Sequence, residues 1–258
     1  MVQRIRIRYA KRGHLRFTSH RDFARAFERA VRRAGVPIAY SQGFSPHPKI
    51  SYASAAPTGA ASEAEYLEIG LQAVVDPQQV RTALDASLSP GLDVIEAVQA
   101  EVGSSLADQI DASRWRIELP GVSPARLAEA VAAFVAAEEV LVERLTKQGR
   151  RRFDARGAVF SIKSVFVIKS EELDEPPDGV SAPPCAILDL VVRQVTPSVR
   201  PDDVLAGLRV VADLESPVPP RATRLAQGRL TAKGEIVDPL TAEGDVSNGR
   251  TLIGEPSE

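Results

Sequence analysis

The sequence predicts an α+β fold built from two tandem ferredoxin-like domains and a disordered acidic tail. Segments with strict two-residue alternation, typical of strands, interleave with segments of helical periodicity. Their order, β-α-β-β-α-β, is that of the ferredoxin-like unit and occurs twice. The predicted domains span residues 1–102 and 113–233, and a single larger α+β domain is the alternative. Residues 234–258 have few large apolar side chains and a net charge of −5, which predicts the tail.

The first domain begins with a predicted strand at residues 3–9, where apolar and arginine side chains alternate. A helix follows at 19–34, because Ser19 is a suitable N-cap and Phe23, Phe27 and Val31 share one face. Gly35 then supplies a helix stop. The remaining predicted elements are strands at 50–54, 65–71 and 92–98 and a helix at 77–88.

The second domain repeats this pattern after the polar stretch 103–112. Residues 114–119 alternate as the first strand does, and Ser123 precedes a helix that begins at Pro124. The remaining predicted elements are strands at 139–147, 157–169, 185–195 and 224–231 and a helix at 201–214. The basic segment 144–156 is interpreted as a hairpin or a flexible loop that could hold a nucleic-acid backbone.

Cysteine and hydropathy patterns exclude several classes of protein. The single cysteine, Cys185, excludes an internal disulfide framework and a cysteine-rich zinc or iron-sulfur site. No apolar run reaches 18 residues, and the arginine-rich N-terminus offers no signal-peptide core. We therefore expect a cytoplasmic protein with no membrane partner and no cofactor.

Positive charge is concentrated at the start of the chain. Residues 1–52 contain twelve Lys or Arg residues and two acids, a net charge of +10, so the other 206 residues carry −12. Such asymmetry indicates a polyanionic partner. Because both helices of a ferredoxin-like unit cover one sheet face, we expect Arg4, Arg6 and Arg8 on the open face, about 7 Å apart, where they suit a phosphodiester backbone. The alternative is an ordinary solvated strand face.

The loop from Tyr40 to Lys49, YSQGFSPHPK, offers aromatic, histidine and lysine side chains within ten residues. Such a loop suits base stacking and phosphate contact. The alternative is a connecting loop whose Phe44 is buried in the core. Glu63, Glu65 and Glu68 are expected to be solvated or paired with arginines.

The three histidines lie within residues 14–47. Acid-base ribonuclease chemistry by His20 or His47 and a three-histidine metal site are both conceivable, but no HxH or HExxH spacing is present. We expect His20 to cap the helix or to contact phosphate.

Residues 15–66, LRFTSHRDFARAFERAVRRAGVPIAYSQGFSPHPKISYASAAPTGAASEAEY, resemble the radical-SAM-linked family of uncharacterised bacterial proteins. The resemblance rests on the pattern RF-x-SH-x-D-x-x-RA-x-ERA-x-RRAG-x-P-x-AYSQGF-x-P-x-P-K-IS. It implies an accessory role beside a radical-SAM protein in the modification of RNA or the ribosome. No radical-SAM domain accompanies these residues, so such a partner would act in trans, and His47 occupies a position where a basic residue is expected.

Together these observations predict a non-catalytic RNA-binding accessory protein. It would act on transfer or ribosomal RNA with a modification or processing enzyme, either a radical-SAM protein or a ribonuclease in trans. A metal-independent endoribonuclease using His20 or His47, and a module that docks an acidic protein surface, are the alternatives. The residues predicted to contact RNA are Arg4, Arg6, Arg8, Arg16, His20, Arg21, Arg25, Tyr40, Gln42, Phe44, His47, Lys49 and Tyr52.

Overall fold

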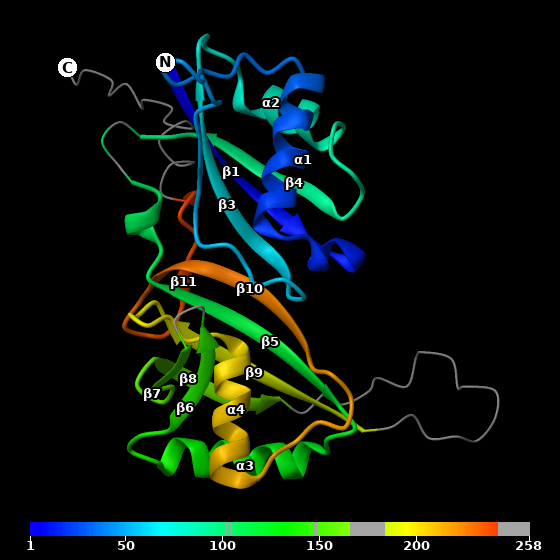
Figure 1. Cartoon of the computed structure of the whole chain (residues 1–258), viewed down its shortest axis with the longest axis vertical. Coiled ribbons are helices and arrows are strands. Elements are labelled where there is room, and N and C mark those ends of the chain that lie inside the picture. Colours follow the sequence, from blue (N-terminus) through cyan, green and yellow to red (C-terminus); the bar gives the residue numbers. More distant parts are fainter. Residues whose placement is uncertain (102, 104, 147–148, 166–183, 242–258) are drawn as a thin grey trace, which may run out of the picture.

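The computed structural model describes residues 1–101, 103, 105–146, 149–165 and 184–241. It is a mixed α+β fold whose core is mostly sheet, with four α-helices among the described residues (Figure 1). No helix in this part of the chain is long and apolar enough to cross a membrane.

The first half contains the predicted order of elements. These are β1 (Gln3–Lys11), α1 (His20–Arg33), β2 (Ile50–Tyr52), β3 (Ala61–Leu71), α2 (Pro77–Asp85) and β4 (Leu92–Gln99), with a short 3-10 helix, η1 (Gly13–Phe17), before α1. The strands lie in the order β4-β1-β3, with β2 on the far side of β3, and neighbours are antiparallel.

Local chemistry explains these elements. The side chain of Ser19 accepts a hydrogen bond from the backbone N–H of Asp22, as expected of an N-cap. The apolar side of β1 packs against α1, where the ring of Tyr9 stacks on that of Phe23 with centroids 4.3 Å apart. Helices α1 and α2 contribute to the same core, so both cover one face of this sheet.

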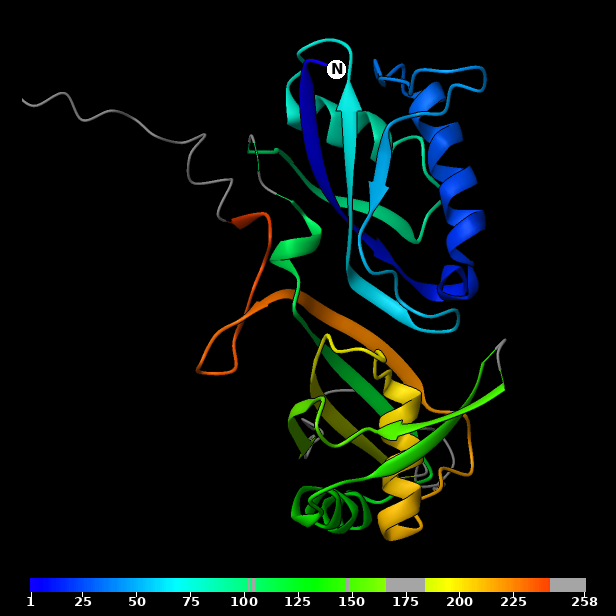
Figure 2. The ribbon, with the colours of Figure 1, turned by 60° about the vertical axis from the view of Figure 1, so that its left-hand side comes forward.

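The second half adds a hairpin to the predicted order. Its elements are η2 (Ala107–Gln109), β5 (Ala112–Pro120), α3 (Pro124–Ala136), β6 (Leu141–Thr146), β7 (Gly149–Asp154), β8 (Val159–Val165), β9 (Cys185–Arg193), α4 (Pro201–Ala212), β10 (Arg221–Leu230) and β11 (Ile236–Val237). Among the described residues, β6 and β7 pair only with each other, which confirms the hairpin interpretation of 144–156, and they cross α4 in Figure 2. The last residues of the predicted strand 157–169 lie outside the described residues.

One sheet runs through both halves. Its order is β4-β1-β3-β10-β5-β9-β8, with β2 added on β3 and β11 on β10. The halves meet where β3 and β10 pair in parallel, with Ala61 opposite Thr223 and Ser62 opposite Arg224. Residues 54–60 and the start of α4 are therefore brought to this junction, which is lined by side chains from both halves.

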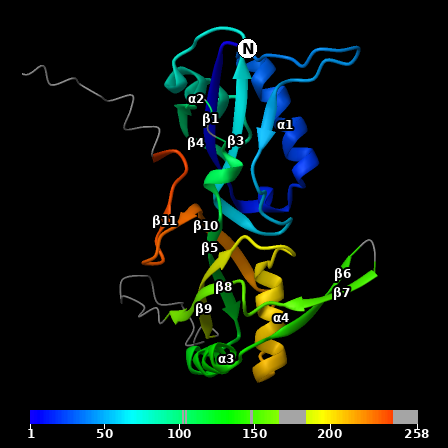
Figure 3. The same cartoon turned by 90° about the vertical axis from the view of Figure 1, so that its left-hand side faces the viewer.

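The helix-free face of the first half is partly covered, contrary to the expectation of an open face. Leu106 and Ile110, which flank η2, and Leu240 form a small apolar cluster with Ala64 and Tyr66, and Figure 3 shows η2 in front of this sheet. The predicted disordered tail is accordingly wrong for residues 234–241, which form β11 and bury Leu240 completely. The rest of that tail lies outside the described residues.

Candidate nucleic-acid interface

The arginines of β1 do not form the predicted exposed row. Arg6 is completely buried, and its Nε donates a hydrogen bond of 3.0 Å to Glu68. Arg4 pairs with the same carboxylate at 3.1 Å, and Arg8 pairs with Asp238 at 2.6 Å. Two features explain why these arginines are not exposed. The strand register places Glu68 of β3 directly opposite Arg6, and the segments around η2 and β11 pack over this face of the sheet. This part of the predicted surface is largely neutralised.

Helix α1 carries much of the exposed positive charge of the first half. Arg21, Arg25, Arg29 and Arg32 are exposed and lie within one narrow arc of the helix, which spans about 16 Å at 1.5 Å per residue. We call these four residues the arginine stripe. Among the described residues, no carboxylate forms an ion pair with any of them. Their guanidiniums are therefore available to an external anion.

The loop 41–49 presents the predicted aromatic side chain to solvent. Phe44 is fully exposed at the loop tip, so the alternative in which it is buried in the core is wrong. Ser41 and His47 close the base: the Ser41 N–H donates to the His47 carbonyl at 2.9 Å, and the Ser41 hydroxyl lies 3.0 Å from His47 Nδ1. Gly43 has φ +127°, which a residue with a Cβ rarely adopts.

The other predicted residues of this loop are also at the surface. Tyr40 is 41% exposed, and Gln42 and Lys49 are exposed. In Figures 2 and 3 the loop projects from the end of the sheet at which α1 terminates. The loop and the last turn of α1, which carries Arg32, thus lie at the same end of the first half.

Tyr52 is not an exposed stacking platform. It packs edge-on against His20, with ring centroids 4.9 Å apart, and against Phe23. Burial, with a contribution from the charge of Glu28, raises the pKa of Tyr52. Its hydroxyl is buried without a hydrogen-bond partner in the described structure. His20 therefore helps to cover Tyr52, while the N-cap of α1 is Ser19.

Arg16 lies apart from the stripe, at the junction of the halves. Its guanidinium stacks 4.8 Å from the centre of the ring of Phe17, which is 57% exposed. Both residues line a cavity of about 250 Å³ that also receives Pro201 at the start of α4.

A shallow groove crosses the uncovered part of the helix-free face. It consists of two adjoining cavities of about 420 and 400 Å³ that share Arg4, Ser51 and Glu68. His47 and Lys49 line one end, and residue 52 lines the other. The groove brings together four of the residues predicted to contact RNA, but His20 is not among its lining residues. The four are Arg4, His47, Lys49 and Tyr52. No contact in the described structure joins the two candidate catalytic histidines.

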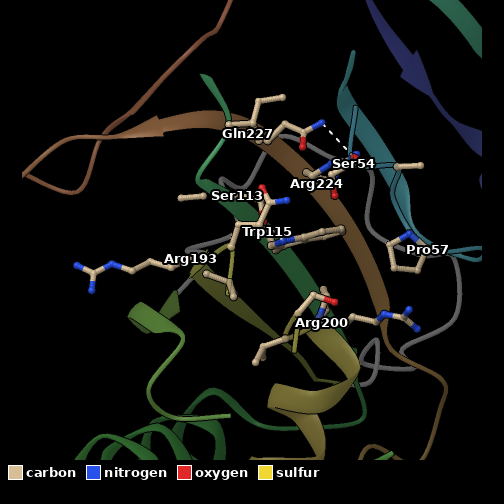
Figure 4. Close-up of a pocket in the computed structure, with 16 residues that line it drawn as sticks. Ser54, Pro57, Ser113, Trp115, Arg193, Arg200, Arg224 and Gln227 are labelled. Carbon is tan, nitrogen blue, oxygen red and sulfur yellow. Dashed lines mark hydrogen bonds between the residues drawn. The ribbon is translucent and has the colours of Figure 1, made fainter. Parts of the chain in front are cut away.

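Another cavity, of about 200 Å³, also lies at the junction of the halves (Figure 4). Behind it Glu65 and Arg224 form an ion pair in which each side chain is 3% exposed. The Arg224 guanidinium also lies 5.4 Å from the centre of the ring of Trp115. The sequence did not predict this site, because its walls come from segments that are distant along the chain. Trp115, the sole tryptophan of the chain, is the sequence feature that could have drawn attention to it.

The acidic side chains between residues 63 and 68 are all paired with arginines, as expected. Glu63 pairs with Arg12, Glu65 with Arg224 and Glu68 with the arginines of β1. No group of three or more His, Cys, Asp or Glu side chains in the described part of the chain could hold a metal ion.

The chain belongs to a family of uncharacterized proteins conserved in bacteria, DUF2344, whose model matches residues 4–201. This match includes the arginine stripe, the loop 41–49 and most of the second half. No curated protein matches the chain. The link to radical-SAM proteins that the sequence resemblance implies stays a prediction.

Proposed function

We propose that this protein binds RNA through the arginine stripe of α1 and the loop 41–49. Phosphates would be held by Arg21, Arg25 and their two neighbours on the stripe, and an unpaired base would stack on Phe44. Lys49, which is exposed at the end of the loop, adds a further positive charge to this surface. We place the protein in the cytoplasm, where transfer and ribosomal RNA are found.

The observation that carries this proposal is the contrast between two sets of arginines. Those of β1, together with Arg12, are neutralised by carboxylates of the same chain. The four arginines of the stripe have no such partner within the described structure, although the chain has a formal net charge of −2. A helix face with four unpaired guanidiniums favours a polyanion as its ligand, since phosphate is bound by arginine in a charge-assisted, bidentate manner.

We further propose that the bound RNA, transfer or ribosomal RNA, is presented to a modification or processing enzyme. This step rests on the resemblance of residues 15–66 to the radical-SAM-linked family, since none of the residues placed here forms an evident catalytic group. The enzyme would be a radical-SAM protein or a ribonuclease acting in trans.

We also propose that each half of the chain is a ferredoxin-like unit. Its support is the strand order of each half: β4-β1-β3-β2 in the first and β10-β5-β9-β8 in the second, all antiparallel. The hairpin β6–β7 is then an insertion in the second unit.

The direct test replaces three residues of the stripe together, in the variant Arg21→Gln/Arg25→Gln/Arg29→Gln. Because each lost phosphate contact removes roughly 0.7–0.9 from the slope of log K against log salt, we expect the slope to fall by about 2 to 3. Total bacterial transfer RNA and ribosomal RNA fragments serve as probes in filter-binding titrations.

The matched control is Arg114→Gln/Arg126→Gln/Arg209→Gln, which removes the same charge from arginines that are exposed but paired with acids. Equal loss of binding in both variants would reject the stripe as the interface. Capture of a protein by the wild type in nuclease-treated lysate, with no RNA bound by pure protein, would favour the protein-docking alternative. RNA fragments that disappear with His20→Ala/His47→Ala would favour the ribonuclease.

A further inference from the structure

The cavity at the junction of the two halves is formed by four segments that are distant in sequence. They are the loop before β3, the start of β5, the segment from β9 to α4, and β10. Its volume of about 200 Å³ is several times that of a water molecule, about 30 Å³, and below the roughly 300–1,000 Å³ of drug-sized pockets. The space therefore suits one small ring system.

A buried amide supplies the cavity with an unused acceptor. Gln227 is 1% exposed, and its side-chain nitrogen donates to the carbonyl of Ala64 at 2.6 Å and to that of Ser54 at 3.4 Å (Figure 4). The carbonyl oxygen of Gln227 accepts no hydrogen bond from the described residues. Because this oxygen keeps some accessible surface at the cavity wall, a hydrogen-bond donor on a ligand can reach it.

The adjacent wall supplies a donor and an aromatic ring. Trp115 Nε1 donates to the hydroxyl oxygen of Ser113 at 2.8 Å, which leaves the hydroxyl proton of Ser113 free to be donated. Trp115 is held in place by Arg224, which is fixed in turn by Glu65. An acceptor, a donor and an indole around one small space match the edge of a nucleobase.

Positive charge flanks the cavity on two sides. Arg193 and Arg200 line it and extend in opposite directions (Figure 4). The guanidinium of Arg193 lies 5.0 Å from the centre of the Phe160 ring, and neither arginine forms an ion pair within the described structure. Of the nearby acids, Asp203 is engaged by Arg144 at 2.8 Å and Asp202 is exposed. Two guanidiniums on either side of a base site are suited to the phosphates that precede and follow one inserted nucleotide.

We propose that the junction cavity binds one nucleotide, with its base beside Gln227 and Ser113 and its phosphates at Arg193 and Arg200. This inference rests on the proposed RNA binding for its source of nucleotide, an unpaired position of the RNA. A free ribonucleotide has the same chemistry and is the other source.

Trp115 makes the proposal directly measurable, because it is the only tryptophan in the chain. Its fluorescence is titrated with a short single-stranded RNA, with the same RNA annealed to its complement, and with each of the four ribonucleoside monophosphates. We expect quenching by the single strand and not by the duplex. Quenching by the monophosphates at comparable concentrations identifies the free nucleotide as the ligand.

Two variants test the site itself. Ser54→Phe fills the cavity from an exposed position and is expected to abolish quenching. Arg193→Gln/Arg200→Gln is expected to weaken the interaction by about tenfold or more, as the loss of charged hydrogen bonds implies. Arg229→Gln, an exposed residue of β10 that does not line the cavity, is the control and should titrate as the wild type does.

Filter binding of the same RNA separates this proposal from the proposed function. If RNA binds but neither the Trp115 signal nor the effect of Ser54→Phe appears, the cavity proposal is overturned and RNA binding by the stripe stands. If no RNA binds and the monophosphates quench Trp115, the cavity site stands for a free nucleotide and the proposed function fails. If no RNA binds and the monophosphates do not quench Trp115, both the cavity proposal and the proposed function are overturned.

Discussion

Glu65 of β3 and Arg224 of β10 form a buried ion pair that joins the two halves of the molecule, with 3% of each side chain exposed. The second carboxylate oxygen of Glu65 accepts the backbone N–H of Ala56 at 3.1 Å, and Arg224 Nε donates to Ser62 at 3.3 Å. Both charges are thus held where β3 and β10 of the two halves pair in parallel.

Removing one partner should be far more harmful than removing both. Arg224→Met leaves the Glu65 carboxylate buried without its counter-charge, and we expect a loss of about 3–5 kcal/mol in the free energy of unfolding. Glu65→Leu/Arg224→Met should recover most of it, because neither charge of this pair is then left buried without its partner. Urea unfolding of the single and double variants gives the coupling energy, and a single variant that loses less than about 1 kcal/mol would show that the pair is not essential to the junction.

Leu240 should be a structural residue although it belongs to a segment predicted to be disordered. Its side chain is completely buried against Tyr66 and the residues that flank η2. Leu240→Ala should lower the free energy of unfolding by about 2–5 kcal/mol. Val237→Ala, at a side chain that is 44% exposed, should change it by less than about 0.5 kcal/mol. Equal stability of the two variants in thermal unfolding would contradict this packing.

Lys11 should make stability depend on pH in the alkaline range. It is 5% exposed, and burial lowers its pKa from the ordinary value of 10.5, with Glu65 opposing this shift. Between the lowered pKa and 10.5 the folded chain binds fewer protons at Lys11 than the unfolded chain, so its contribution to the free energy of unfolding rises with pH in that window.

The variant Lys11→Met lacks this titration. The difference in stability between wild type and variant should therefore shift in favour of the wild type as the pH rises toward 10.5, as measured by urea unfolding at a series of pH values. A difference that does not change with pH would mean that Lys11 is solvated well enough to titrate normally.

Phe44 should matter for RNA and not for folding. Its ring is fully exposed, so Phe44→Ala should leave the unfolding temperature unchanged. If a base stacks on it, the substitution should weaken RNA binding by about 1–3 kcal/mol. Leu145→Ala, at a side chain 80% exposed on β6, is the control. The same affinity for both variants would remove Phe44 from the interface.

Local patterns predicted the elements of the first half well. Alternation at Ile5, Ile7 and Tyr9 marks the buried side of β1, and Ser19 marks the start of α1, because both depend on neighbours within a few residues. The exposure of the α1 arginines follows from the same periodicity. These are the parts of the candidate site that the sequence alone located.

Long-range partners could not be predicted in the same way. That Arg6 is buried depends on its register opposite Glu68 and on cover from segments more than 90 residues away. The junction cavity depends on the pairing of β3 with β10, which no local pattern encodes. The sequence could not decide between a hairpin and a flexible loop at 144–156, because RRRF in β7 shows no alternation of apolar and polar residues.

The salt dependence of RNA binding tests the central claim most directly. Four phosphate contacts, one for each arginine of the stripe, would lower the affinity roughly a hundredfold between about 50 and 200 mM salt. A fall of that size, lost in Arg21→Gln/Arg25→Gln/Arg29→Gln, is the expected result. An affinity that changes by less than about threefold over the same range would contradict an interface built on phosphate contacts.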